Sequence, residues 1–362
     1  MEDTLFLREL KRNRFFDDLK YIFGRIGEEA KQRRLRVVLV LNPRSTQAKK
    51  AETEILRPLN QFLFEEKQVT GVTIFRYAVL PTDLDDNAKK LAEIIEDGDV
   101  MIAIGGDGTA AIGVNAAMLS GKKVAYYTLP YGNFNDIAKT VKMARGREVY
   151  ALEALVDEEH FRFALCYFTL GMLAESTKLF DEPRVREYLK KKKRHLFYSL
   201  WVLAVWFLKN RRQRFLSRVK VMMRREEKRN GSGDLSGGDG LTNNSEIDRS
   251  EVELLELLEV KEASDVIVLN GETMARILRG GKYYQAGEFL LSIKNLRGVF
   301  SVACFMIRGV LCRVAGKKVG GVTLEFSDEL EAMEIQSEGE YKKISQVRKI
   351  EFKKATRPLQ IL

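Results

Sequence analysis

The sequence has 362 residues, enough for two domains, and its 45% hydrophobic and 31% charged residues are typical of a globular protein that folds in water. Its three cysteines form no CxxC pair and it has only two histidines, which argues against a disulfide framework, a zinc site and a Ser-His-Asp triad. We therefore expect buried thiols and acid–base chemistry by carboxylates. The first residues, MEDTLFLREL, contain no signal-peptide core, so we expect a reducing, cytoplasmic compartment.

The net charge of +10 is concentrated in one segment of the chain. Residues 178–229 contain 18 Lys and Arg against 5 Asp and Glu, whereas the rest of the chain contains 43 against 46. A basic excess confined to one segment indicates an anionic partner, either a nucleic acid or a layer of lipid headgroups.

In chain order, a helix is expected over residues 4–30, followed by an alternation of strands and helices as far as about residue 140. The expected strands are 36–41, 72–79, 100–104 and 123–129, and the expected helices between them are 48–63 and 87–96. This alternation predicts a doubly wound parallel sheet. We assign residues 1–34 to a helical extension and 35–150 to an α/β nucleotide-binding domain.

The turn Gly105-Gly106-Asp107-Gly108-Thr109, after the third strand, has the composition of a phosphate-binding loop. Its glycines allow a sharp turn, and the helix that follows presents free N–H groups to an anion. Asp107 favours metal-assisted phosphate chemistry, because a carboxylate repels a phosphate unless a cation or a proton lies between them. The alternative is a structural turn in which Asp107 caps the helix. Two more polar turns, 42–46 and 130–136, also follow strands, where ligands bind in such sheets.

Beyond residue 150 the pattern changes to closely spaced strands. They are expected at 161–170, 218–223, 265–269, 289–294, 319–326 and 332–336. Such spacing predicts an antiparallel β-sandwich over residues 151–343. Residues 227–250 form a flexible low-complexity insertion. The second Gly-Gly-Asp-Gly, at 237–240, lies in this insertion without a strand before it, so we interpret it as unrelated to phosphate binding.

An apolar run, LFYSLWVLAVWFL at residues 196–208, lies between basic flanks and is too short to span a bilayer. It either packs on the sheet or lies at a membrane surface, with the basic segment 190–214 on anionic lipid. These two interpretations are compatible. We expect no nucleic-acid partner, because the basic segment surrounds an apolar run and does not interleave aromatic residues with Lys and Arg.

Together, these turns resemble the motifs of the diacylglycerol kinase and sphingosine kinase superfamily of lipid kinases, especially its soluble bacterial branch. The family motifs NPxSG, GGDGT and PxGTxND stand here as Asn42–Thr46, Gly105–Thr109 and Pro130–Asp136. Its C-terminal Asp-Gly-Glu corresponds to Glu338-Gly339-Glu340. The resemblance covers residues 35–362, apart from the insertion.

The resemblance implies an ATP- and Mg²⁺-dependent kinase that phosphorylates the hydroxyl of diacylglycerol or a related membrane lipid, in a cleft between the α/β domain and the sandwich. Glu340 would accept the hydroxyl proton, and Asp107 would act through the metal or phosphate network. The nucleotide would contact Asn42, Pro43, Arg44, Ser45, Thr46, Gly105, Gly106, Asp107, Gly108, Thr109 and Asn133. Residues 344–362 would return to the first domain. The enzyme would be peripheral on the inner face of the membrane, and a homodimer is compatible with the sequence.

The chain also departs from the family pattern. Ala111 and Ile112 replace an Asn-Glu pair, Asn133 a Thr, Thr46 a Gly, Glu338 an Asp, and Ala286-Gly287 an Asp-Gly tied to a structural magnesium. These departures keep two alternatives open. One is a non-catalytic or weakly active relative that binds lipid or nucleotide. The other is a kinase of a soluble substrate that resembles the NAD kinases, which share the GGDG loop.

Overall fold

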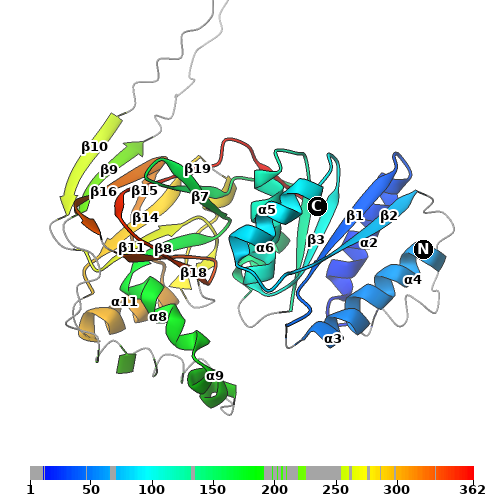
Figure 1. Cartoon of the computed structure of the whole chain (residues 1–362), viewed down its shortest axis with the longest axis horizontal. Coiled ribbons are helices and arrows are strands. Elements are labelled where there is room, and N and C mark those ends of the chain that lie inside the picture. The colour runs from blue at the N-terminus through cyan, green and yellow to red at the C-terminus, as the bar shows by residue number, and fades with distance from the viewer. Residues whose placement is uncertain are drawn as a thin grey trace, which may run out of the picture.

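The computed structural model has two parts that lie side by side, an α/β part and a part built largely of strands (Figure 1). The described residues are 11, 13–45, 47–65, 71–131, 135–190, 198, 202, 205–206, 209, 219–225, 254–260, 263–274, 278–285, 287–296, 299–330 and 332–362. Thr46, Asn133, Ala286 and the insertion 227–250 lie outside these ranges, as does most of the apolar run 196–208.

The α/β part is organised around a six-stranded sheet with the order β2-β1-β3-β4-β20-β5. Its strands are β1 (Leu35–Leu41), β2 (Val72–Ala78), β3 (Val100–Gly105), β4 (Ala125–Pro130), β5 (Glu148–Val149) and β20 (Leu359–Ile361). Neighbouring strands pair in parallel, except that β5 is antiparallel to β20. The central strand β3, with the sequence VMIAIG, is buried throughout, as expected for a parallel strand covered on both faces. The predicted parallel sheet is confirmed.

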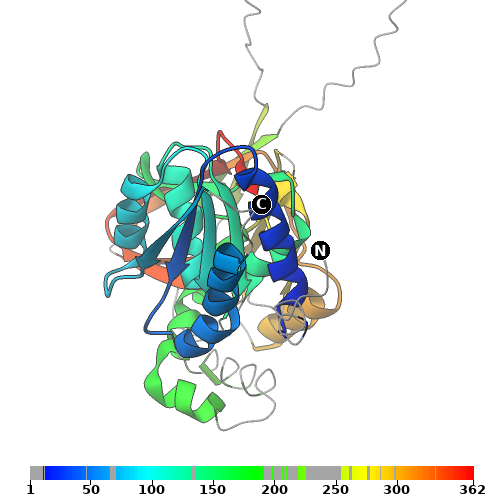
Figure 2. The ribbon, with the colours of Figure 1, turned by 90° about the vertical axis from the view of Figure 1, so that its right-hand side faces the viewer.

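Helices cover both faces of this sheet (Figure 2). They are α2 (Phe16–Ala30), α3 (Ala48–Ala51), which continues through one π-helical turn (Glu52–Leu56) into α4 (Arg57–Glu65), α5 (Leu84–Ile94), α6 (Asp107–Leu119) and α7 (Asp136–Met143). Helix α5 begins after Asp83, whose carboxylate accepts a hydrogen bond from the N–H of Asp86 at 2.8 Å. Of the helix expected over residues 4–30, residues 1–10 lie outside the described ranges, and the helix begins at Phe16.

The second part consists of two six-stranded antiparallel sheets whose inner faces share one hydrophobic core. The first sheet has the order β10-β9-β16-β19-β6-β7, with β6 (Leu152–Val156), β7 (Glu159–Ala164), β9 (Val219–Arg225), β10 (Leu254–Val260), β16 (Gly321–Leu330) and β19 (Val347–Lys354). The second has the order β15-β14-β11-β8-β17-β18, with β8 (Tyr167–Gly171), β11 (Asp265–Leu269), β14 (Phe289–Lys294), β15 (Lys317–Val319), β17 (Met333–Ser337) and β18 (Glu340–Ile344). Phe168 and Phe352 pack between the sheets with ring centroids 5.3 Å apart. The predicted antiparallel sandwich is confirmed.

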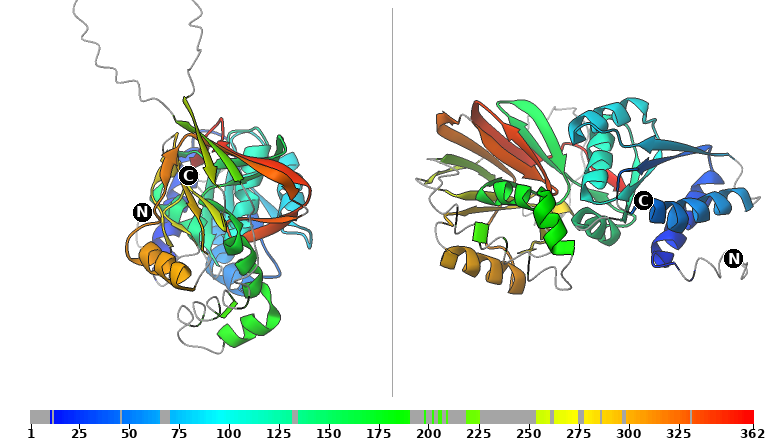
Figure 3. Two further views of the ribbon diagram at one scale, coloured as in Figure 1. Left: turned by 90° about the vertical axis from the view of Figure 1, so that its left-hand side faces the viewer. Right: turned by 60° about the horizontal axis from the view of Figure 1, so that its bottom comes forward.

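Other elements surround the sandwich. They are α8 (Met172–Asp181), α9 (Pro183–Lys190), α11 (Val299–Leu311), the 3-10 turn Tyr283–Gln285 and the short hairpin of β12 (Thr273–Met274) and β13 (Leu278–Arg279). Figure 3 shows α8, α9 and α11 emerging on the same side of the sandwich. The sequence analysis did not predict α11. None of the helices in the described part of the chain has the length and apolar composition needed to cross a bilayer.

Two expectations from the sequence are wrong. The strand expected over residues 161–170 is two strands, β7 and β8, which belong to different sheets. The chain crosses between the sheets at Leu165 and Cys166, where the Asn270 amide donates to the Leu165 carbonyl at 2.8 Å and the backbone N–H of Asn270 donates to the Cys166 carbonyl at 2.7 Å. The three thiols are not all buried either, since Cys304 and Cys312 are exposed on or beside α11 and only Cys166 is buried.

The C-terminal residues connect the two parts. Strand β19 belongs to the sandwich, whereas β20 pairs in parallel with β4 of the first sheet. The Tyr21 hydroxyl of α2 donates a hydrogen bond to the carbonyl of Leu362 at 2.7 Å. The chain therefore passes back to the α/β part between residues 354 and 359.

Candidate active site at the junction of the two parts

The three polar turns predicted from the sequence follow three neighbouring strands of the first sheet. Leu41 of β1 pairs with Ile104 of β3, and Gly105 pairs with Pro130 of β4. The N–H of Tyr131 then donates to the carbonyl of Gly105 at 2.7 Å. Because these strands run in parallel, their carboxyl ends meet at one edge of the sheet, and the turns lie next to one another there.

The GGDGT turn has the expected strand–turn–helix geometry. Gly106 is extended and precedes α6, which begins at Asp107, and a glycine at this position provides no capping side chain. A Cβ atom on Gly105 would overlap the Thr109 side chain, so a glycine is required for Thr109 to fold back over the turn. Gly106 therefore offers no side-chain acceptor to the N–H groups of the first turn of α6, and this arrangement suits the binding of an anion by those groups.

Asp107 connects α6 to α7. Its two carboxylate oxygens accept hydrogen bonds from the backbone N–H groups of Asp136 and Ile137, each at 3.2 Å, and its side chain is buried. These are N–H groups of the first turn of α7, which have no partner within the helix. Asp107 thus caps a helix, as the structural alternative supposed, but the helix is α7 and not its own.

Glu340 comes from the sandwich and reaches the GGDGT turn. It follows the tight turn between β17 and β18, in which Glu338 and Gly339 have φ angles of 54° and 87°. A Cβ atom on Gly108 would overlap the Glu340 carboxylate, so this carboxylate lies directly against the turn. The structure therefore brings together two predicted site elements that are more than 200 positions apart in the sequence.

Glu338 lies behind this contact and is almost fully buried. Its Oε1 accepts a hydrogen bond from the backbone N–H of Cys166 at 2.6 Å, and its Oε2 finds no hydrogen-bond partner among the described residues. Burial, and then the nearby charges of Asp107 and Asp136, raise the pKa of the Glu338 carboxyl to about 8. At pH 7 this carboxyl is therefore mainly protonated.

Asp136 is held from the sandwich side. The Thr273 hydroxyl donates to its carboxylate at 2.6 Å, and both side chains are buried. The side chains of Asp107, Asp136 and Glu338 thus form a buried cluster of three carboxyl groups at the boundary of the two parts. In the described ranges, however, no set of three or more His, Cys, Asp or Glu side chains is arranged to hold a metal ion.

The Asn42–Thr46 turn is held by its own side chains. Asn42 Oδ1 accepts a hydrogen bond from the N–H of Arg44 at 3.0 Å, and Ser45 Oγ accepts one from the N–H of Gln47 at 3.3 Å. Pro43 and Arg44 are exposed, and the Arg44 guanidinium donates to the carbonyl of Leu80 at 2.6 Å. Thr46 and Asn133, both predicted nucleotide contacts, lie outside the described residues.

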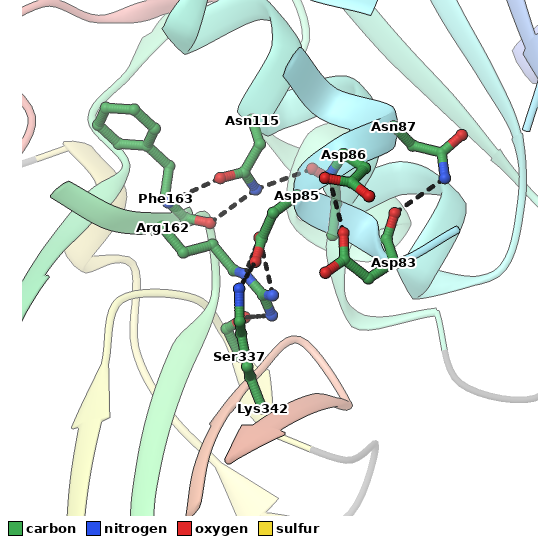
Figure 4. Close-up of polar contacts among 10 residues, drawn as sticks. Asp83, Asp85, Asp86, Asn87, Asn115, Arg162, Phe163, Ser337 and Lys342 are labelled. Atoms are coloured by element: carbon green, nitrogen blue, oxygen red, sulfur yellow. Dashed lines mark hydrogen bonds and ion pairs between the residues drawn. The ribbon is translucent and has the colours of Figure 1, made fainter. Parts of the chain in front are cut away.

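A network that the sequence analysis missed fixes the sandwich against α5 (Figure 4). Arg162 of β7 is buried, and its guanidinium donates to the Asp85 carboxylate at 2.8 Å and to the Ser337 hydroxyl at 3.1 Å. Lys342 of β18 contacts the other Asp85 oxygen at 2.6 Å. The network therefore holds both strands of the hairpin that carries Glu340. The only signal in the sequence is Arg162 itself, a charge inside the apolar stretch FRFALCYFTL.

Asn115 makes a second connection of this kind. Its amide donates to the Phe163 carbonyl at 2.9 Å and its carbonyl accepts from the Phe163 N–H at 2.8 Å, so α6 binds the edge of β7 (Figure 4). The departures Ala111 and Ile112 lie on the same helix with 1% and 5% of their surface exposed. They are packing residues of the α/β core.

Comparison with known proteins agrees with this architecture. Residues 36–167 match the family model of the diacylglycerol kinase catalytic domain, a range that includes the GGDGT turn and ends in β8. A crystal structure of a diacylglycerol kinase from Bacillus anthracis str. Sterne is similar, with a TM-score of 0.54 and 17% identity over 90% of this chain and 97% of that one. A candidate diacylglycerol kinase from the same organism gives a TM-score of 0.55 at 17% identity with the same coverage. At this identity the structures show a shared fold. No protein with a curated description matches the sequence significantly.

Proposed function

Because the chain belongs to the diacylglycerol kinase-like superfamily of lipid kinases, with the catalytic domain over residues 36–167, we propose that it transfers the γ-phosphoryl group of ATP to the hydroxyl of diacylglycerol or a related membrane lipid. The observation that carries the proposal is the position of Glu340. A carboxylate that lies against Gly108 can meet a hydroxyl group directly beside phosphates bound at the turn.

In the proposed reaction, the backbone of the GGDGT turn and the N-terminus of α6 bind the nucleotide phosphates. Glu340 accepts the proton of the lipid hydroxyl. At the same time the hydroxyl oxygen forms a bond to the γ-phosphorus, and the bond between that phosphorus and the ADP oxygen breaks. Asp107 positions α7, and with it the turn after β4, by capping the N-terminus of that helix.

A magnesium ion is part of this proposal. Mg²⁺ commonly binds kinases through one or two carboxylates together with substrate phosphates, and a site of that kind does not require three protein ligands. Glu338 Oε2 is a buried carboxyl oxygen without a hydrogen-bond partner in the described residues, and it would bind an ion that arrives with the nucleotide only after the carboxyl releases its proton. When bound, the ion would neutralise charge on the phosphates.

We further propose that the protein works at the cytoplasmic face of a membrane as a peripheral enzyme. The basic segment 190–214 supports a contact with anionic lipid through its charge. Most of this segment lies outside the described residues, so its charge alone carries this part of the proposal.

The test is a kinase assay with labelled ATP, Mg²⁺ and mixed vesicles containing diacylglycerol, with mass spectrometry of the products. Glu340→Gln should lower kcat by about 10²- to 10⁴-fold and leave ATP binding intact, because a general base contributes about that much. The matched control is Glu96→Gln. Glu96 is exposed, pairs with Arg36 and precedes β3, at the opposite edge of the same sheet.

Other outcomes would identify the alternatives. Full activity of Glu340→Gln would remove Glu340 from the role of base. ATP binding without turnover on any lipid would identify a non-catalytic relative, and formation of NADP from NAD would identify a kinase of a soluble substrate.

A further inference from the structure

Helix α11 has one face in the core and one in water. Val302 and Phe305 are buried in the hydrophobic core. Gly309 packs so closely on β13 that a Cβ atom there would overlap the Leu278 side chain. On the opposite face Ile307 and Leu311 are 59% and 68% exposed. The helix is therefore firmly seated, and its exposed apolar side chains do not result from a loose attachment.

An apolar outer face is unusual for a surface helix. Such helices normally present charged and polar residues to water. Ile307 and Leu311 are the two most exposed large hydrophobic side chains in the described part of the chain, and the next most exposed, Met143, has only 41% of its surface in water. They are four positions apart, so they project from the same side of α11. Two such side chains form a small apolar ridge.

The segment of chain that contains this ridge is basic. Residues 289–324 contain six Lys and Arg and no Asp or Glu. Among them Arg308 and Arg313 are exposed beside the ridge, and Lys317 and Lys318 are exposed at the start of the next strand. A ridge of apolar residues with exposed cations close to it in the sequence complements the interface of an anionic bilayer, where acyl chains meet phosphate headgroups.

The place of α11 in the fold agrees with this complementarity. Helices α8, α9 and α11 emerge on one side of the sandwich (Figures 1 and 3). One of these helices, α8, contacts β17 and β18, the two strands of the hairpin that carries Glu340.

We infer that α11 docks this protein on an anionic lipid bilayer, with Ile307 and Leu311 inserted below the headgroups and Arg308 and Arg313 on the lipid phosphates. The choice of a bilayer as the partner rests on the proposed function. A second copy of this chain is disfavoured as the partner, because a symmetric contact through α11 would bring the same cations together.

The native thiols allow a direct measurement. Cys304 and Cys312 are exposed beside the ridge, whereas Cys166 is buried. In the full chain with Cys304→Ser, an environment-sensitive fluorophore on Cys312 should shift its emission to the blue with vesicles of phosphatidylcholine and phosphatidylglycerol. Phosphatidylcholine alone should give little shift, and added salt should reduce the effect. An unchanged emission with anionic vesicles would overturn the inference.

Variants separate the apolar from the basic contribution. Ile307→Ser with Leu311→Ser should lower sedimentation with anionic vesicles roughly tenfold, and Arg308→Gln with Arg313→Gln should lower it and flatten its salt dependence. The control is Leu119→Ser, an exposed leucine at the end of α6 in the α/β part. Wild-type sedimentation of the first double variant, or its change from dimer to monomer without lipid, would refute the docking role.

The vesicles in these measurements contain neither diacylglycerol nor ATP, so docking is tested without catalysis. If the proposed function also holds, the Ile307→Ser, Leu311→Ser variant should keep its activity on a short-chain diacylglycerol dispersed in water and lose it on vesicles. Vesicle binding that depends on α11, without kinase activity on either substrate, would support the docking helix and reject the proposed function.

Discussion

Glu338 makes the stability of the protein depend on pH in a predictable direction. Its folded-state pKa is about 8, against an ordinary value of 4.5, because it is buried beside Asp107 and Asp136. A raised carboxyl pKa means that the folded chain holds a proton that the unfolded chain releases. The stabilisation is therefore complete below pH 4.5 and is lost as the pH rises towards 8. Each pH unit in this window costs about 1.4 kcal/mol.

The variant Glu338→Gln keeps the shape of the protonated side chain and cannot ionise. Its free energy of unfolding should fall less steeply between pH 5 and pH 8 than that of the wild type, by about 1.4 kcal/mol per pH unit at most, and it should be the more stable of the two at pH 8. Urea titrations at each pH measure this. Asp265, whose pKa burial raises to about 7, titrates in both proteins and cancels in the difference.

The control for this measurement is Leu119→Ser, which changes an exposed side chain and removes no titratable group, so it should leave the slope unchanged. Parallel slopes for the wild type and Glu338→Gln would refute the reasoning, because they would mean that Glu338 has the same proton affinity in the folded and unfolded chains.

Two further substitutions test the junction of the two parts. Asp85→Ala leaves the buried Arg162 guanidinium without its carboxylate, so it should lower the free energy of unfolding by about 3 kcal/mol. The control is Asp86→Ala, at the exposed neighbouring position, which should change this free energy by less than about 0.5 kcal/mol. Equal effects of the two substitutions would show that the network does not hold the hairpin. Gly108→Ala places a methyl group where the Glu340 carboxylate lies, so it should lower kcat. The control is Gly24→Ala, whose added methyl group meets no atom within 4 Å. A wild-type kcat in Gly108→Ala would show that Glu340 has no fixed position there.

The sequence predicts elements whose signal is local and leaves out contacts between distant segments. Strand β3 and the turn after it were predictable, because an unbroken apolar run ending in Gly-Gly-Asp-Gly is a local pattern. The break between β7 and β8 was not, because FRFALCYFTL contains no Gly or Pro that would interrupt a strand, and the reason for the break, Asn270, is more than 100 positions away. The helix α11 was also missed, because it is rich in apolar residues and a short apolar run can be read as a buried strand as well as a helix.

The same distinction holds within the candidate site. The motifs identify Asp107 and Glu340, but nothing in their neighbourhood in the sequence predicts that the Asp107 carboxylate caps α7. The Asp85, Arg162 and Lys342 network combines residues from α5, β7 and β18, and no spacing rule connects them. Such contacts depend on how the two parts dock, which periodicity does not encode.

The Glu-Gly-Glu turn assigns opposite environments to two carboxyl groups that are two positions apart. Glu338 has a left-handed backbone at φ 54°, and its side chain is directed inward to the Cys166 N–H. Glu340 starts the next strand and is exposed against Gly108. Because Glu338 is mainly protonated at pH 7, it adds little negative charge beside Asp107 and Asp136. A charged Glu338 would increase the repulsion of any phosphate at the turn, so burial of this residue favours anion binding there and leaves Glu340 as the exposed carboxylate facing the loop.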